Sequence, residues 1–144
     1  MLRIQQAAFD MGTVLAGFGA GAGAIVTFCG IVRDEGGQLT ALQIEHYPAM
    51  TEKAIAAMMD QARGRWDLID VLVIHRYGLL PVGAPIMMVA TAARHRAAAF
   101  QAAEFLMDYL KSRAPFWKQE IGTDGATWVA AKPQDEAALD RWGA

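Results

Sequence analysis

Two lysine side chains lie seven positions apart in the stretch YLKSRAPFWKQE, on either side of an Ala-Pro-Phe-Trp turn. The residue pattern places Lys111 at the end of a helix and Lys118 at the start of a strand. Pro115 and the aromatic pair after it would hold the turn rigid. Ammonium groups that share a pocket lower each other's pKa, so one lysine can carry protons near neutral pH while the other stays charged.

Further cationic side chains are candidates for binding an anion beside these lysines. Arg94, His95 and Arg96 lie at the start of a predicted helix, where the helix dipole is already positive, so they lower stability unless an anion is bound. The alternative is a solvated loop, and the sequence favours neither. Arg33 ends a strand where a glycine turn begins, as either a solvated residue or a ligand of a phosphate-like group. With the lysines, these residues describe a site for an anionic substrate with acid and base capacity.

The composition excludes several classes of protein. The formal net charge of -2 and the pI near 5.9 give no global basic field, so we expect no nucleic-acid partner. No apolar run reaches the roughly 18 residues of a membrane span, so we expect no membrane association. The lone cysteine, Cys29, excludes a disulfide framework and a cysteine-based zinc site within this chain. Without a secretory signal pattern, the expected location is the cytoplasm, and no cofactor is expected.

Other conspicuous residues have simpler interpretations. The glycine-rich stretch at residues 17–23 lacks the strand before it and the helix after it that a dinucleotide-binding loop requires, so it predicts a flexible connector. Cys29 lies in an apolar run, which indicates a small buried side chain rather than a nucleophile. His46 and His75 are interpreted as histidines at strand ends without a partner.

The hydrophobic periodicity predicts an α+β fold for residues 1–144 as one domain, with antiparallel hairpins packed against two main helices. The helices are predicted from Pro48 to about residue 65 and at about 96–111. Residues 24–32 are predicted to form a buried strand that pairs with 39–47 as a hairpin. Elsewhere the pattern predicts an edge strand at 1–9, a brief helix at 10–18, strands at 68–78, 86–93, 116–121 and 127–131, a loop at 79–85 and a terminal helix at 134–142.

These motifs resemble the large, catalytic subunit of molybdopterin synthase. The matching segments follow the family order and cover roughly residues 24 to 130; they are VTFCGIVR, LQIEHYPAMTEKA, IHRYGLLPVG, HRAAAFQAAEFLMDYLKSRAPFWKQE and TWV. The resemblance implies an α/β hammerhead-type fold and a homodimer of large subunits. It also implies a small ubiquitin-like subunit docked on each, which makes a heterotetramer.

In that family the enzyme is a sulfurtransferase of molybdenum cofactor biosynthesis. It converts cyclic pyranopterin monophosphate to molybdopterin by inserting two sulfurs as a dithiolene. The sulfur arrives as a thiocarboxylate on the C-terminal Gly-Gly of the small subunit. The resemblance therefore implies that this chain needs no sulfur nucleophile of its own, which agrees with a lone, buried Cys29.

The resemblance also assigns roles to residues of the motifs. Lys111 and Lys118 resemble the catalytic lysines, and some site groups are expected to cross the dimer interface. This sequence departs from the family at Ile31, where some members have a lysine, at Arg94, where a small residue is usual, and at Lys132, where an arginine is often found. The implied substrate contacts and pocket or channel walls are Arg33, His95, Arg96, Phe28, Met107 and Lys132.

An alternative from another class is a noncatalytic binding or scaffold module whose basic cluster holds a phosphorylated ligand. A phosphatase-like hydrolase agrees less well with the sequence, because no convincing nucleophile or metal cluster is present. Loss of turnover with retained ligand binding in a lysine variant would separate an enzyme from a binding module.

Overall fold

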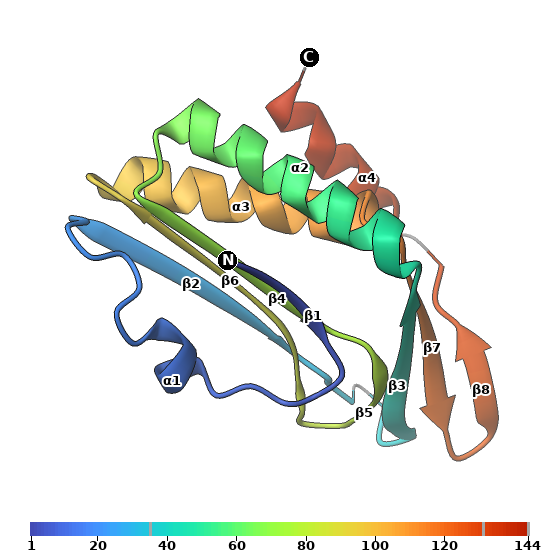
Figure 1. Ribbon diagram of the computed structural model, residues 1–144. Coiled ribbons are helices and arrows are strands. Elements are labelled where there is room, and N and C mark those ends of the chain that lie inside the picture. The colour runs from blue at the N-terminus through green and yellow to red at the C-terminus, as the bar shows by residue number, and fades with distance from the viewer. Residues whose placement is uncertain (35, 131, 144) are drawn as a thin grey trace.

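The computed structural model describes residues 1–34, 36–130 and 132–143 (Figure 1). Its strands form two four-stranded sheets, and two long helices lie over one of them. The strands are β1 (Leu2–Gln5), β2 (Ala24–Ile31), β3 (Leu39–His46), β4 (Asp70–Arg76), β5 (Gly78–Pro81), β6 (Pro85–Ala93), β7 (Phe116–Gly122) and β8 (Gly125–Trp128). The helices are α1 (Met11–Leu15), α2 (Pro48–Trp66), α3 (Arg96–Ser112), α4 (Pro133–Ala138) and the 3-10 helix η1 (Leu139–Trp142).

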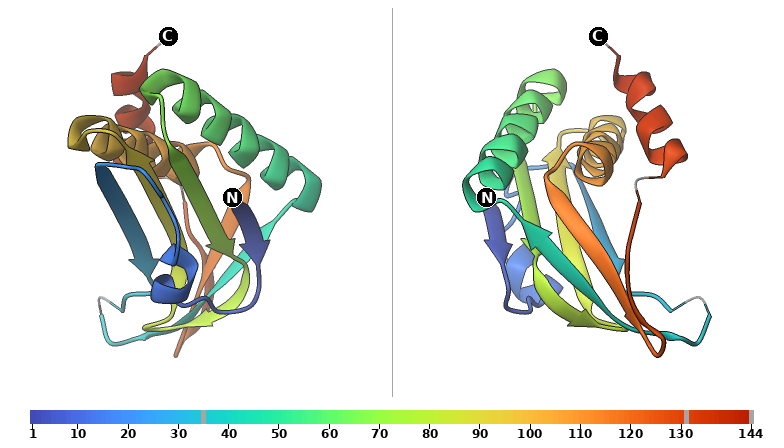
Figure 2. Two further views of the ribbon diagram at one scale, coloured as in Figure 1. Left: turned by 60° about the vertical axis from the view of Figure 1, so that its left-hand side comes forward. Right: turned by 90° about the vertical axis from the view of Figure 1, so that its right-hand side faces the viewer.

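The first sheet has the order β1-β4-β6-β2, with β1 parallel to β4 and the other pairs antiparallel. Its central strands β4 and β6 are almost continuously apolar because both of their faces are covered. Val71, Val73 and Val89 pack against α2 and α3 on one face. On the opposite face, Leu72 and Ile74 pack against α1 and its flanking residues, and Figure 2 shows the sheet between these helices.

The two long helices confirm the predicted periodicity. Helix α2 starts with Pro48 in its first turn, where a missing N–H is tolerated. It ends at Trp66, and the capping residue Asp67 that follows adopts the left-handed conformation. Ile55 and Met59 point from α2 into the core, where they meet the buried side of α3 around Phe105. Among the described residues, no helix has both the length and the apolar character that a membrane crossing requires.

The second sheet has the order β5-β3-β7-β8 and packs at one end of the first sheet (Figure 1). Strand β3 pairs antiparallel with β7, so that Ile44 lies opposite Lys118. Buried residues between the sheets, Val32, Ile44 and Leu80, form a small apolar cluster against which Phe116 packs. This junction brings the end of β2, the end of α3 and the start of β7 together.

The predicted α+β class is confirmed, but the predicted hairpin of residues 24–32 with 39–47 is wrong. Strand β2 pairs with β6, and β3 pairs with β5 and β7 in the other sheet. Strand β2 is also less buried than predicted, because it is an edge strand, and Ile25 and Ile31 are each about half exposed. The predicted loop at 79–85 overlaps β5, which starts at Gly78. This strand is too short to be recognised from its own sequence, and its pairing with β3 stabilises it.

Gly23 begins the turn into β2 at a point of close backbone approach. Its N–H donates to the Ala93 carbonyl, and a Cβ at this position would overlap the carbonyl oxygen of Arg94. We expect Gly23→Ala to lower the free energy of unfolding by about 1–3 kcal/mol, measured by urea denaturation. Gly64→Ala is the matched control: Gly64 lies within α2 with open space around it, so alanine there should stabilise by about 0.5–1 kcal/mol. Equal stability of the two variants would contradict the close approach.

Candidate active site

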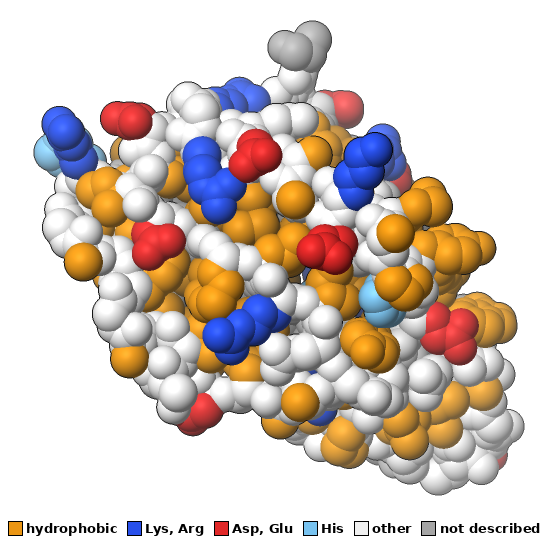
Figure 3. Space-filling view, in the orientation of Figure 1, with side chains coloured by type: hydrophobic (Ala, Val, Ile, Leu, Met, Phe, Trp, Pro, Cys, Tyr) orange, Lys and Arg blue, Asp and Glu red, His pale blue; other side chains and the backbone are white. Residues whose placement is uncertain are grey.

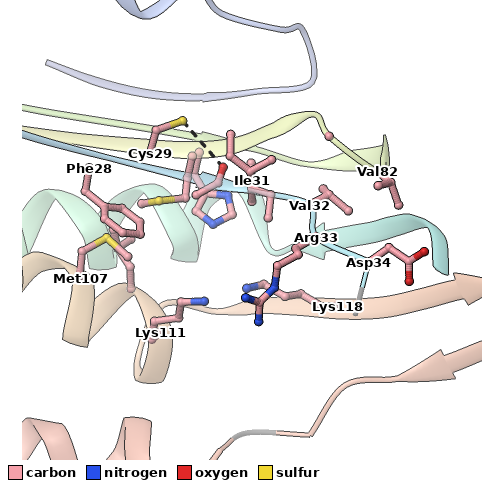
Figure 4. A pocket seen from close by; sticks show the side chains of 16 residues that line it. Phe28, Cys29, Ile31, Val32, Arg33, Asp34, Val82, Met107, Lys111 and Lys118 are labelled. Atoms are coloured by element: carbon pink, nitrogen blue, oxygen red, sulfur yellow. Dashed lines mark hydrogen bonds between the residues drawn. The ribbon is translucent and has the colours of Figure 1, made fainter. Parts of the chain in front are cut away.

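A cavity of about 740 Å³ lies at the junction of the two sheets and the end of α3 (Figure 4). Apolar side chains form much of its wall, and cationic side chains enter it from three elements or their ends. Its lining includes Phe28, Cys29, Ile31, Arg33, Asp34, His75, Ile86, Met87, Met107, Leu110, Lys111 and Lys118.

Lys111 and Lys118 enter this cavity from different elements, as the sequence predicts. Lys111 lies in the last turn of α3, and Lys118 is the third residue of β7. Figure 4 shows both ammonium groups directed into the cavity, together with the side chain of Arg33. Burial, and next the charge of Lys111, lower the pKa of Lys118 from 10.5 to about 8. Lys118 can therefore exchange protons near physiological pH.

The turn between the lysines is held from two sides. The buried hydroxyl of Thr51, from α2, donates to the carbonyl oxygen of Pro115 over 3.3 Å. From the other side, the Ser112 hydroxyl donates to the carbonyl oxygen of Asp135, and Arg113 forms an ion pair with Glu136 of α4. The fixed turn sets the relative position of the two ammonium groups.

Arg33 connects the lysine cavity to a second, more polar cavity of about 370 Å³. The second cavity shares Ile31, Arg33 and Asp34 with the first and is also lined by Lys132. The positive charge of Lys132 acts on Lys118, where it lowers the pKa further. An anionic ligand that extends from the first cavity toward the second would meet Arg33 and Lys132, although the carboxylates of Asp34 and Glu120 also line the second cavity.

A family model described as MoaE protein matches residues 4–113 of this chain. The chain belongs to the MoaE protein family. The molybdopterin synthase catalytic subunit of Cereibacter sphaeroides is 65% identical over 142 residues, which cover 96% of this chain and 97% of the relative. The solved structure of the molybdopterin biosynthesis MoaE protein from Burkholderia ambifaria MC40-6 has a TM-score of 0.86 at 47% identity, covering 100% of this chain and 98% of that one.

These relatives confirm the resemblance to the catalytic subunit of molybdopterin synthase, and the MoaE structure confirms the fold. A more distant structure is a chain from the complex of subunits 1 and 2 of the molybdopterin-converting factor of Helicobacter pylori. It has a TM-score of 0.76 at 22% identity, covering 92% of this chain and 91% of that one, so it shares the fold of the MoaE chain.

His95 and Arg96 are not brought to the lysine cavity within one MoaE chain. They lie exposed at the start of α3, whereas Lys111 lies at its end. At a rise of 1.5 Å per residue, about 22 Å of helix separates Arg96 from Lys111. The prediction that these residues share one site therefore does not hold inside a single chain, because a rigid helix keeps them apart.

Phe28 and Met107 line the lysine cavity of this MoaE chain and also an adjoining groove. The groove, of about 540 Å³, lies between β2 and α3, and Phe100 forms part of its outer wall. Cys29, in contrast to its prediction as a buried side chain, is only partly buried; it is among the residues that line the lysine cavity, but Figure 4 shows its sulfur on the side of β2 opposite to Phe28 and the lysines. Its position on an edge strand explains the difference. Burial nevertheless raises the pKa of the Cys29 thiol, which disfavours the reactive thiolate.

Sequence reasoning missed His75, which it treated as a strand-end histidine without a partner. The MoaE structure buries His75, stacks its ring on Phe116 and places it in the wall of the lysine cavity. The sequence did contain an indication of this role, because His75 directly follows the apolar run VLVI. A polar residue that continues a buried strand is itself buried and needs hydrogen-bond partners inside the protein. Among the described residues, no group of three or more His, Cys, Asp and Glu side chains is arranged to hold a metal ion.

Proposed function

We propose that this MoaE chain is the catalytic subunit of a molybdopterin synthase, a cytoplasmic sulfurtransferase that converts cyclic pyranopterin monophosphate to molybdopterin. In this proposal both dithiolene sulfurs come from the thiocarboxylated C-terminal Gly-Gly of a small ubiquitin-like subunit. One observation carries the proposal: lysines from two elements share a cavity, and one of them has a pKa of about 8. Such a lysine can give and take protons at neutral pH, which an ordinary surface lysine cannot.

The two lysines have different tasks in the proposed chemistry. The thiocarboxylate sulfur forms a bond to an electrophilic carbon of the pterin as a bond from that carbon to oxygen breaks, and the electron pair of the broken bond places negative charge on that oxygen. The ammonium group of Lys111 stabilises this charge, and Lys118 transfers the proton that neutralises it. For the sulfur to remain on the pterin, the bond between sulfur and the acyl carbon of the tail must break, and attack by water there returns the carboxylate of the partner.

The groove between β2 and α3 supports a route for the partner's tail. It leads along Phe28 and Met107 into the lysine cavity, and its walls are mainly apolar. A chain of glycines fits between such walls because it has no side chains to clash. The Helicobacter pylori structure is described as a complex of two subunits, which supports a two-protein assembly for this chain as well.

A homodimer within a heterotetramer is part of the proposal. His95 and Arg96 lie too far along α3 to reach the cavity of their own chain, so we assign them to the substrate site of a second copy. The open edge of β2 supports a dimer, because exposed Ile25 and Ile31 leave an apolar border that another chain can cover.

Reconstitution tests the proposed function directly. The purified chain is mixed with a thiocarboxylated small subunit and cyclic pyranopterin monophosphate, and the dithiolene product is sought by mass spectrometry. Product formation that requires all three components supports a synthase. Tight pterin binding without any product would indicate a noncatalytic binding module instead.

Arg33→Ala should raise KM about tenfold or more and leave kcat within about threefold. A charge-assisted contact to a phosphate is present in both the ground state and the transition state, so its loss weakens binding without changing the chemical step. Steady-state kinetics of the reconstituted enzyme measure both constants. Arg3→Ala is the matched control, because Arg3 lies on β1 and does not line either cationic cavity. An unchanged KM with a lower kcat for Arg33→Ala would instead place Arg33 at the reacting atoms.

A further inference from the structure

His75 is a buried polar residue to which the chemistry above gives no task. Its side chain is 3% exposed, and its ring is stacked on that of Phe116, with centroids 3.7 Å apart and an angle of 16° between the planes. His75 belongs to β4 in the first sheet, and Phe116 belongs to β7 in the second. The stack therefore fixes the imidazole at the wall of the lysine cavity, which is the kind of preorganisation that a ligand contact needs.

The hydrogen bond of the ring determines which nitrogen carries the proton. Nδ1 of His75 lies 2.8 Å from the carbonyl oxygen of Arg76, and since a carbonyl oxygen only accepts, Nδ1 is the donor. In a neutral imidazole Nε2 is then an acceptor. The ring stays neutral because burial, followed by the charges of Lys118 and Lys111, lowers the pKa of His75 to about 3 against the opposing effect of the Arg76 carbonyl.

Nε2 of His75 is accessible from the cavity. No donor among the described residues reaches this nitrogen. Within the same part of the chain, the one side-chain nitrogen or oxygen that is both sealed from solvent and without a partner is Nδ1 of His46. Nε2 is therefore not sealed, and the ring to which it belongs lines the lysine cavity.

The other polar side chains of the cavity offer a different kind of hydrogen bond. Lys111, Lys118 and Arg33 are donors, and they suit the acceptor oxygens of a phosphate. Asp34 is the carboxylate of the lining, but its Oδ1 already accepts from the backbone N–H groups of Gly36, Gly37 and Leu39. His75 thus supplies a buried acceptor in a site otherwise dominated by donors. Inorganic sulfate carries no donor for this acceptor at neutral pH, whereas a pterin ring carries N–H groups that require one.

We propose that Nε2 of His75 accepts a hydrogen bond from an N–H or O–H group of the pterin and so orients the ring against the two lysines. The inference rests on the proposed function and deepens it, since it makes His75 a residue that selects a ring with a donor over an anion without one, such as sulfate. An acceptor left unpaired in a buried site is unfavourable, so a ligand without the donor binds less well.

The test compares His75→Phe, which keeps the stack on Phe116 but removes the acceptor, with His75→Gln, which restores an acceptor near the position of Nε2. Calorimetry measures binding of cyclic pyranopterin monophosphate, with inorganic sulfate, which has no donor at neutral pH, as the comparison ligand. We expect His75→Phe to bind the pterin about tenfold or more weakly, with sulfate affinity unchanged, and His75→Gln to recover most of the loss. His46→Phe is the matched control. The ring of His46 also lies beside that of Phe116, with the two centroids 5.9 Å apart, but His46 does not line the cavity.

A measurement on the wild-type protein tests the same proposal without requiring that a substituted protein folds. Nitrogen-15 NMR of the imidazole should show Nδ1 protonated, and the Nε2 resonance should shift on addition of the pterin but not of sulfate. An unshifted Nε2 resonance, or equal losses of pterin and sulfate affinity in His75→Phe, would overturn the role of His75. Wild-type binding and turnover with an unaffected His75→Phe variant would refute this inference alone. Failure of the wild-type chain to bind the pterin would overturn the proposed function along with it.

Discussion

Lys118→Ala is expected to lower turnover at least about a hundredfold, the usual effect of removing an acid–base group, while the domain remains folded. The reason is the position of Lys118 in a cavity where burial and the charge of Lys111 bring its pKa to about 8. The rate is measured as dithiolene product per minute in the reconstituted enzyme, and folding is checked by thermal unfolding. Lys111→Ala should cause a loss of similar size, because in the proposed mechanism this lysine supplies the charge that stabilises the pterin as negative charge develops.

Arginine substitution and pH distinguish charge from proton transfer. Lys118→Arg keeps a positive charge but cannot exchange a proton near neutral pH, so it should remain as inactive as the alanine variant. Removing the charge at position 111 removes a repulsion that destabilises the ammonium form of Lys118, so the pKa of Lys118 rises. The residual activity of Lys111→Ala should therefore show its pH inflection above the wild-type value near 8. Full activity of Lys118→Arg would contradict a proton-transfer role for Lys118.

The pKa of Lys118 also has a consequence for stability. In the unfolded chain this lysine takes its ordinary value of 10.5, and in the folded chain its pKa is lowered to about 8. The folded state therefore holds the proton less tightly, so wild-type stability should rise as pH increases from about 8 to 10.5. The Lys118→Ala variant should lack this rise, which identifies Lys118 as its source.

Deleting the last two residues of the small subunit should abolish product formation, while a measurable complex with this chain remains. The sulfur is expected on the terminal thiocarboxylate, so a shortened tail cannot bring it to Lys111 and Lys118. The tail gives up conformational freedom when it enters the groove, and most of the affinity is therefore expected from the globular surface. Calorimetry or gel filtration measures the complex, and mass spectrometry measures the product.

The matched control is a small subunit in which the tail keeps its length but a bulky residue replaces the next-to-last glycine. Such a residue should clash with Phe28 and Met107, which line both the groove and the lysine cavity. We expect slow turnover from this variant, and none from the deletion. Full-rate turnover by the isolated large subunit with free sulfide would contradict the two-protein mechanism.

The sequence was sufficient to predict elements whose signals are local. The apolar positions of α2 and α3 repeat at helical spacing, and Pro48 marks the start of α2 within one residue. The placement of Lys111 and Lys118 also followed from local signals, because a helix end and a strand start meet at a short turn with a proline. The pairing of strands could not be predicted in this way, because β2 and β3 are joined by a glycine turn and their sequences suit a hairpin. In the structure β2 pairs with β6 and β3 pairs with β7, and these partners are distant in sequence.

The roles of histidines depended even more on tertiary structure. The stack of His75 on Phe116 joins strands of two different sheets, and the two residues lie far apart in the sequence. The separation of Arg96 from Lys111 could have been recognised, because both lie on the same straight helix and about 22 Å of rise lies between them. A contact between Arg96 and a cavity would need a second surface, and such a surface leaves no local pattern in one sequence.

The pairing of Ile44 with Lys118 has a consequence for the order of events during synthesis. These residues lie about 70 positions apart, and contacts of such long range form late because a large loop must close first. A chain that stops short of β7 therefore contains α3 and Lys111 but lacks the strand that carries Lys118. Among the residues that line the lysine cavity Lys118 is the last to be synthesised, so the cavity is complete only when β7 has paired with β3.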